Sequence, residues 1–431
     1  MYTLGVVLFA AGVAASIGLH ELGHLVPAKK FGVKVTQYFV GFGRTVWSRR
    51  RGETEYGLKA VPLGGYVKLV GMLPPGPDDE PGKLRKSNTG MFTQLISDAR
   101  AAEYEHVEPG DDERLFYRLP WWKKVIVMSG GPMVNLVLAF LLFGGVFVLH
   151  GVLVPKTTVN EVSDCVIAAS DAKPDRTCTD ADPVAPAKQA GLRSGDEILE
   201  FNGAAVTSWD HLTELIRANA DGHATITYER DGTRHTTTTD TTVSPRRSVD
   251  DPDEFVEVGF LGVTPEFVRE KQGPVFVVTT MGDYTWQTVK ALADLPVKVV
   301  DVAQAAVGLE DRQQDSPMSV VGASRVAGEI SSDHKIPIGD RFVSLIMLLG
   351  GINLFVGMFN FVPLLPLDGG HIAGALYEAV RRGLAKLFRR PDPGYFDVAK
   401  LLPVAYVMAS VILLMSVVLI YADIVAPVRI G

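Results

Sequence analysis

The sequence predicts a polytopic α-helical membrane protein with four transmembrane helices, a cytoplasmic β-hairpin region and one extracytoplasmic α+β domain. Two observations predict this class. Mean hydropathy is +0.17 although 21% of the 431 residues are charged, so apolar and polar residues must be segregated along the chain. Four apolar runs, at residues 2–28, 125–149, 342–367 and 401–421, are long enough to cross about 30 Å of hydrocarbon as helices.

Composition also excludes several classes. Hydrophobic residues make up 47% of the chain, which is too much for a disordered protein. The 42 Lys and Arg against 49 Asp and Glu give a net charge of −7, so the chain lacks the basic character of a nucleic-acid-binding protein, and we expect no nucleic acid partner. Two cysteines are too few for a disulfide scaffold.

The first apolar run is assigned to a transmembrane helix at residues 1–30. Within residues 2–28, the only acidic or imidazole side chains are His20, Glu21 and His24. A secretory signal peptide is the alternative, because small residues in the run resemble a cleavage site. However, no positive charge precedes the run, and it continues past that site to Pro27, which favours a membrane helix.

Basic residues close to the ends of the spans predict the orientation. Lys29, Lys30 and Lys34 follow the first span, whereas only Lys156 follows the second and only Arg429 the fourth. The loop at residues 371–400 carries six basic residues: Arg381, Arg382, Lys386, Arg389, Arg390 and Lys400. We therefore expect a multi-pass protein of the bacterial plasma membrane, with both termini outside and the loops at residues 31–122 and 371–400 in the cytoplasm.

The first cytoplasmic loop, residues 31–122, is expected to hold membrane-associated β-strands. Residues 33–40 and 53–60 alternate polar and apolar, with glycine turn signals around them, and residues 66–69 are a candidate edge strand. Residues 74–112 are acidic and interrupted by Pro and Gly, with one short helix expected near residues 91–105. Trp121 and Trp122 are expected to anchor the second membrane helix, residues 123–150, at the interface.

The second loop is expected to form an α+β domain at residues 154–265. A helix start, a tight turn, a strand and an Asn-Gly hairpin turn follow one another over residues 186–203. A helix at residues 208–218 and strands at 224–230, 233–239 and 255–263 complete it. Because thiols outside the cytoplasm are not kept reduced, we favour a Cys165–Cys178 disulfide over two free thiols. Residues 266–340 are expected to form an amphipathic helical linker, either on the membrane surface or as a soluble helical hairpin.

His20, Glu21 and His24 form an HExxH pattern inside the first span. Two imidazoles four residues apart lie on one helical face, where both can bind zinc while the Glu serves as a general base. In water such a pair is often a solvated helix face. Ionisable groups within a membrane span are costly, so here they indicate a functional site.

The third apolar segment, residues 341–370, supplies the missing carboxylate. Asp368 is the only acidic residue between Phe342 and His371. Because the first and third spans run in the same direction, Asp368 and the HExxH pattern both lie toward the cytoplasmic ends. Pro363 and Pro366 break the helix there, and irregular backbone at that depth is tolerated where it lines a cavity. The last helix is expected at residues 401–424.

These two motifs together resemble the site-2 protease family of intramembrane zinc metalloproteases. The third-span motif consists of Asn360, Pro363, Pro366, Asp368 and Gly369. The segments at residues 64–68 and 130–135 are similar to the family as well. The resemblance implies that His20, His24 and Asp368 bind Zn²⁺, that Glu21 is catalytic, and that Asn360 steadies the substrate or transition state.

The four-span layout resembles the bacterial, sigma-factor-regulating branch of that family, and residues 186–203 resemble a PDZ signature. The implied function is an intramembrane zinc metalloendopeptidase. It would cleave single-span membrane proteins such as anti-sigma factors within the lipid bilayer, after an upstream protease has made the first cut. The PDZ-like domain would bind a carboxyl terminus or act as a size filter. The alternatives are a catalytically silent membrane PDZ scaffold or chaperone, and a metal transporter, although internal repeats are absent from the sequence.

Overall fold

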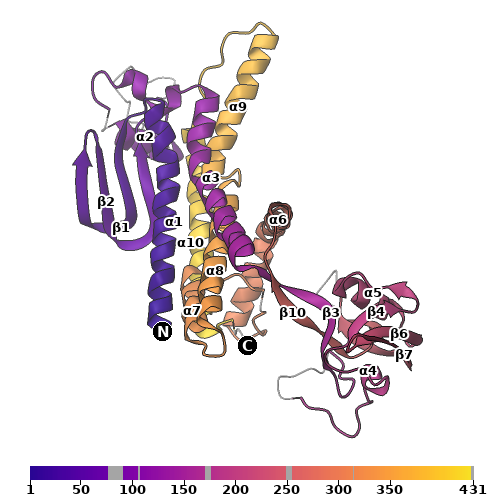
Figure 1. Cartoon of the computed structure of the whole chain (residues 1–431). Helices are drawn as coiled ribbons and strands as arrows, with labels where there is room; N and C mark the ends of the chain where they lie inside the picture. Colours follow the sequence, from indigo (N-terminus) through magenta and orange to yellow (C-terminus); the bar gives the residue numbers. More distant parts are fainter. Residues whose placement is uncertain (76–90, 105–106, 170–175, 249–254, 314, 429–431) are drawn as a thin grey trace. The chain divides into compact units, whose positions relative to one another are not determined.

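The computed structural model of the chain describes residues 1–75, 91–104, 107–169, 176–248, 255–313 and 315–428. They form two compact units, one of Met1–Val148 with Gly273–Gly431 and one of Leu149–Gln272. The first unit contains the long helices and one β-hairpin, and the second is mostly β (Figure 1).

Among the described residues, four helices are long and apolar enough to cross a membrane, so a polytopic membrane protein with β-sheet regions is confirmed. They include α1 (Tyr2–Lys30), α3 (Trp121–Gly145), α8 (Ile338–Asn360) and α10 (Leu402–Val425). The apolar run predicted at residues 342–367 is not one continuous helix: α8 ends at Asn360, and α9 (Asp368–Leu387) begins only at Asp368. Pro363 and Pro366 each lack a backbone N–H, which explains the break between α8 and α9.

Glycines bring α1 and α3 into backbone contact. A Cβ added at Gly23 would lie 2.4 Å from the carbonyl oxygen of Gly130, and one added at Gly130 would lie 1.9 Å from the carbonyl oxygen of Gly23. Since no side chain separates the two helices there, they pack as closely as membrane helices with small residues allow. Gly23 directly precedes His24, so this contact brings the backbone of α3 next to the HExxH pattern.

The β-hairpin is longer than predicted. It consists of β1 (Val35–Arg51) and β2 (Thr54–Leu69), where short strands were expected at residues 33–40, 53–60 and 66–69. The polar, Arg-containing end of β1 is exposed and does not alternate in the way a half-buried strand does. Phe39 lies opposite both Tyr66 and Gly57, so the start of β1 is flanked on both sides by parts of β2. The end of β2 is therefore at an edge of this sheet.

The rest of the segment between α1 and α3 contains α2 (Met91–Tyr104), η1 (Asp112–Arg114) and η2 (Phe116–Arg118). The helix predicted near residues 91–105 is thus present. Residues 76–90 of the predicted acidic stretch lie outside the described residues. The Lys34 Nζ donates to Asp111 Oδ2 at 2.6 Å, and both side chains are largely buried, so this ion pair attaches η1 to the start of β1.

The helices that follow the second unit belong to the first. Two helices, α6 (Pro274–Ala306) and α7 (Val320–Ser332), occupy most of residues 266–340, where a helical linker was expected. Helix α6 packs against α10, and α7 packs against α1 and α8. Arg312 and Asp423 form a buried ion pair of 2.7 Å, which attaches the segment between α6 and α7 to the end of α10.

The described residues of the second unit form an antiparallel sheet, a separate pair of strands and two short helices. Strands β10, β3, β4, β6 and β7 neighbour one another in that order, β5 pairs with β4, and β8 pairs separately with β9. The elements are β3 (Val152–Val162), α4 (Pro186–Gln189), β4 (Glu197–Phe201), β5 (Ala204–Ala205), α5 (Trp209–Ala218), β6 (His223–Arg230), β7 (Thr233–Asp240), β8 (Thr242–Arg247), β9 (Phe255–Phe260) and β10 (Val263–Glu270). Its core includes Phe201, Leu212 and Ile226.

Two details of the second unit bear on the sequence predictions. The strand predicted at residues 255–263 is two strands, because Gly262 has a φ of 90° and turns the chain between β9 and β10. Cys165 and Cys178 are joined by a disulfide with Cα atoms 5.9 Å apart, as the sequence favoured.

Candidate metal centre

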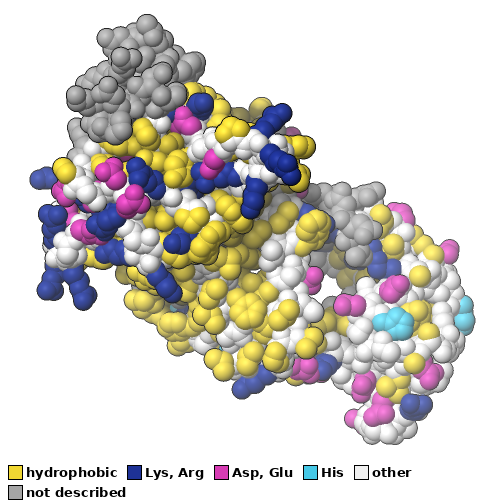
Figure 2. All heavy atoms as spheres, turned by 90° about the horizontal axis from the view of Figure 1, so that it is seen from above, with side chains coloured by type: hydrophobic (Ala, Val, Ile, Leu, Met, Phe, Trp, Pro, Cys, Tyr) yellow, Lys and Arg dark blue, Asp and Glu magenta, His cyan; other side chains and the backbone are white. Residues whose placement is uncertain are grey.

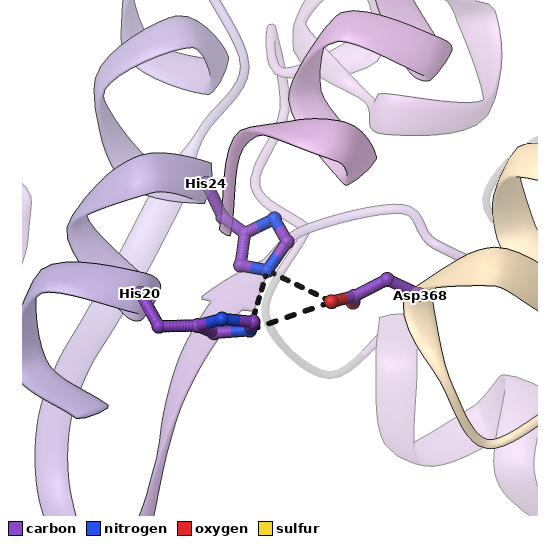
Figure 3. Close-up of side chains that lie close together, drawn as sticks. All are labelled: His20, His24 and Asp368. Atoms are coloured by element: carbon purple, nitrogen blue, oxygen red, sulfur yellow. Dashed lines mark hydrogen bonds and ion pairs between the residues drawn. The ribbon is translucent and has the colours of Figure 1, made fainter. Parts of the chain in front are cut away.

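Two imidazoles and one carboxylate meet at one point in the first unit (Figure 3). The Nε2 atoms of His20 and His24 are 3.3 Å apart. The Oδ2 of Asp368 lies 3.4 Å from His20 Nε2 and 3.3 Å from His24 Nε2. Each residue thus presents one ligand atom to a common position, although 344 positions separate His24 and Asp368 in the sequence.

Local structure explains how Asp368 reaches the histidines. His20 and His24 are one turn apart on α1, whereas Asp368 is the first residue of α9, immediately after the non-helical segment. A Cβ at Gly369 would lie 2.1 Å from the carbonyl oxygen of Val362, so only glycine permits this return of the chain. The helix break therefore places the carboxylate at a helix N-terminus that faces α1.

The histidine orientation is set by α3. His24 Nδ1 lies 2.8 Å from the carbonyl oxygen of Val127, which can only accept, so Nδ1 carries the proton and Nε2 keeps its lone pair. A backbone carbonyl that fixes the far nitrogen of an imidazole is common around metal-binding histidines. Among the described residues, His20 Nδ1 and Asp368 Oδ2 are buried and have no hydrogen-bond partner. A buried carboxylate oxygen without a donor is costly, and a cation at the common position would satisfy Asp368 Oδ2.

Gly131 of α3 is a site residue whose role the sequence did not reveal. A Cβ there would lie 2.3 Å from His24 Nε2 and 2.7 Å from His20 Nε2. Any side chain at this position would therefore occupy the space beside both ligand atoms. The signal in the sequence was the pair Gly130 and Gly131 in an apolar span, which helix packing alone would also explain.

A cleft of about 460 Å³ opens onto the three side chains. Glu21 and Asn360 both line it, so the structure brings together all five residues singled out from the sequence. Asn360 Nδ2 donates one hydrogen to the carbonyl oxygen of Val356 at 3.0 Å, which leaves its second N–H for another acceptor. The end of β2, at residues 65–69, forms another wall of the cleft.

Glu103 also lines the cleft and was not predicted. Its Oε1 accepts hydrogen bonds from the backbone N–H groups of Gly71 at 2.7 Å and Met72 at 3.0 Å. Helix α2 is thereby attached to the residues that follow the edge of β2. A lone glutamate within an acidic loop carries no sequence pattern from which this position could be deduced.

The comparisons with known proteins agree with this geometry. The family model described as Peptidase family M50 matches residues 8–390. The chain belongs to this peptidase family.

Two of the relatives of this M50 peptidase match it over its whole length. Zinc metalloprotease Rip1 of Mycobacterium tuberculosis is 33% identical over 441 residues, covering 100% of this chain and 99% of the relative. Zinc metalloprotease Rip1 of Mycolicibacterium smegmatis is 31% identical, again over 100% and 99%. Zinc metalloprotease RasP of Oceanobacillus iheyensis is 24% identical over 87% of this chain and 91% of the relative. The resemblance to the site-2 protease family is confirmed, and with it a metalloendopeptidase with Zn²⁺ as cofactor.

The donor set of this family M50 peptidase fits that metal. Two imidazole nitrogens and one carboxylate oxygen are ligands that zinc takes in catalytic sites, where three protein ligands leave a fourth position open. The three ligand atoms lie within 4.8 Å of one another, and their residues are buried or half-buried. The open side of the cluster faces the cleft, where a substrate could approach.

Proposed function

We propose that His20, His24 and Asp368 bind the zinc ion and that Glu21 is the catalytic acid–base residue of an intramembrane endopeptidase. The observation that carries the proposal is the convergence of three ligand atoms in a cleft that also holds Glu21. When bound, zinc supplies Lewis acidity and acidifies the attacking water. Glu21 takes a proton from that water and passes it to the leaving amine. The second N–H of Asn360 donates to the oxygen on which negative charge develops.

The edge of β2 is proposed to hold the substrate. A transmembrane helix hides its carbonyl groups in internal hydrogen bonds, so the scissile segment must unwind before it can be cut. The stretch from Gly65 to Leu69 pairs with β1 on one side, and within the described residues no other strand pairs with its free side. An unwound segment could add there as a strand, which replaces its lost hydrogen bonds and points it into the cleft.

The proposed substrates are single-span membrane proteins such as anti-sigma factors that an upstream protease has already cut once. The second unit supports this reading, because its strand order with α5 over the sheet fits a PDZ-like domain at residues 154–265. We propose that this domain acts as a size filter, which admits only substrates that have lost their outer part. Terminal-carboxylate binding is the competing role.

The proposed location is the bacterial plasma membrane, with both termini and the second unit outside and the metal centre toward the cytoplasm. Two observations support this orientation. The residues between α8 and α10 carry six Lys and Arg, and such loops stay in the cytoplasm. The disulfide between Cys165 and Cys178 lies in the second unit and is typical of an oxidising compartment. A reporter fused after Leu149 tests it: activity characteristic of the cytoplasm would contradict the orientation.

Glu21→Gln tests the catalytic proposal. We expect the purified variant to bind zinc in the same ratio as the unsubstituted protein and to lose cleavage of a single-span model substrate. Glu113→Gln is the matched control, because Glu113 is an exposed residue of η1, away from the cleft, and should not alter cleavage. Cleavage by Glu21→Gln at the original rate would refute the assignment. Substrate binding without cleavage by the unsubstituted protein would instead favour the silent scaffold, and metal uptake without cleavage would favour the transporter.

A further inference from the structure

A second cavity, of about 790 Å³, lies at the end of the first unit where α3 and α10 begin. Its walls come from η2, from α9 and from the segment that leads through η4 (Val398–Leu401) into α10. It shares no lining residue with the catalytic cleft. The proposed peptidase chemistry therefore does not account for it.

The charge of this cavity is positive. Arg118, Arg381 and Lys400 line it, against one acidic residue, Asp397. The Asp397 carboxylate is already engaged, because Arg100 Nη2 donates to its Oδ2 at 2.6 Å. Three cationic side chains thus line the cavity; Arg118 Nη1 also pairs, at 3.1 Å, with Glu113, whose side chain is exposed and is not part of the lining.

The positive charge of Arg381 is not neutralised by its own contacts. Its Nη2 donates to the carbonyl oxygens of Pro393 and Gly394, both at 2.8 Å, and carbonyl oxygens do not neutralise its charge. Its Nε is buried and has no hydrogen-bond partner within the described part of the chain. Glu378, one turn earlier on α9, does not compensate it, because its Oε2 pairs with Lys124 Nζ at 2.8 Å.

The other lining groups suit a phosphate-bearing ligand. Tyr377 and Tyr395 also line the cavity, and a tyrosine hydroxyl can donate a hydrogen bond beside the guanidinium and ammonium groups. Arginine in particular matches phosphate oxygens in a two-point geometry. The cavity therefore combines the donors and the charge that an anionic phosphate group requires.

Its position selects the source of that phosphate. Trp121 and Trp122 are exposed at the start of α3, where such residues mark the membrane interface. Lys400 stands two residues before α10. Figure 2 looks onto this end of the molecule, where groups of Lys and Arg side chains lie next to hydrophobic ones. Basic pockets between membrane helices at this level bind anionic lipid headgroups. We propose that the cavity lined by Arg118, Arg381 and Lys400 binds the headgroup of an anionic phospholipid.

The test uses the full chain in nanodiscs of phosphatidylcholine with or without phosphatidylglycerol, with retained lipid counted by native mass spectrometry. Arg118→Gln combined with Lys400→Gln should reduce phosphatidylglycerol retention about 10- to 30-fold. Each basic group near the membrane surface changes lipid affinity by about three- to fivefold, and the two factors multiply. The matched control combines Lys386→Gln with Arg390→Gln, which removes the same charge near the same end but outside the cavity, and should retain the lipid. Equal retention by the two double variants would overturn the proposal.

A second arm separates a lipid from a free phosphate. Protein in neutral detergent is titrated with soluble glycerol phosphate, and the midpoint of thermal unfolding is followed. We expect no shift at concentrations where phosphatidylglycerol binds. A shift that disappears in the Arg118 and Lys400 double variant would show a soluble phosphate site and would overturn the lipid assignment. If the double variant does not fold, Lys400→Gln alone is used, because Lys400 is exposed and the substitution should reduce retention in the same direction.

Discussion

Gly131 of α3 lies so close to His24 of α1 that a methyl group at position 131 would sit 2.3 Å from the His24 Nε2. Two helices about one hundred residues apart in sequence thus leave space for the metal ligands and for little else. A side chain at position 131 would meet only imidazole rings, which can tilt away while the helices stay folded. A side chain at Gly130 or Gly23 would instead meet the backbone of the other helix, which cannot move aside in this way.

We therefore predict that Gly131→Ala loses zinc while the protein still folds. The added Cβ should push the imidazoles of His20 and His24 from their common position and reduce zinc affinity by about 10- to 100-fold, as for other changes around metal ligands. Zinc content after dialysis and cleavage of a model substrate measure the effect. Gly145→Ala on the same helix is the control, since a Cβ there meets nothing within 4 Å. If both variants keep full zinc content, the proposed role of Gly131 is wrong.

Val67→Pro tests the proposed strand addition. Proline removes the backbone N–H of Val67, which faces the cleft and donates to the Glu21 carboxylate, from the edge where a substrate strand would pair. Turnover should fall at least about tenfold, while the unfolding midpoint changes little, because proline is tolerated at sheet edges. Rates and thermal unfolding are measured on the same preparation. A variant with normal turnover, or one whose loss of activity merely follows a loss of folding, would contradict substrate pairing at this edge.

The ion pair of Lys34 and Asp111 predicts how pH affects the hairpin. Burial opposes ionisation of Asp111, yet hydrogen bonds from Lys34 and from the Glu108 N–H outweigh it, so the pKa of Asp111 is lowered. A lowered carboxyl pKa stabilises the fold above the unfolded-state value of about 4, and this contribution disappears as the pH falls through the folded-state pKa. Protection of β1 against hydrogen exchange, taken relative to the intrinsic rate at each pH, should therefore fall on acidification toward pH 3 in the natural protein.

Asp111→Asn removes this pH dependence. At neutral pH the variant should lose about 1.5–3 kcal/mol of local stability, the usual value of a hydrogen bond to a charged group. The protection of its β1, relative to the intrinsic rate at each pH, should no longer respond to acid. Asp112→Asn, at the neighbouring exposed position of η1, is the control and should behave like the natural protein. An acid response that persists in Asp111→Asn would assign it to another group.

The sequence predicted those parts of the site that depend on local spacing. His20 and His24 are one helical turn apart, and hydropathy alone located the four spans, because a membrane imposes the same requirement on every crossing helix. Asp368 could be proposed because acidic residues in apolar segments are rare. Gly131 and Glu103 could not be assigned, since their roles follow from how α1, α2 and α3 pack. The length of β1 was missed because its outer half is polar and exposed, and its pairing partner rather than its own pattern makes it a strand.

Deletion of the second unit tests the proposed size filter. Val152 and Glu270 are paired on adjacent strands, so the two ends of the unit are neighbours and a short Gly/Ser linker can replace residues 154–265. If the unit excludes uncut substrates, the shortened protein should cleave an intact single-span substrate that the full chain leaves uncut, and it should cleave the pre-cut form at a similar rate. Both forms are compared by gel analysis in the same bilayer. If the unit instead captures a carboxyl terminus, cleavage of the pre-cut form should fall and intact substrates should stay uncut.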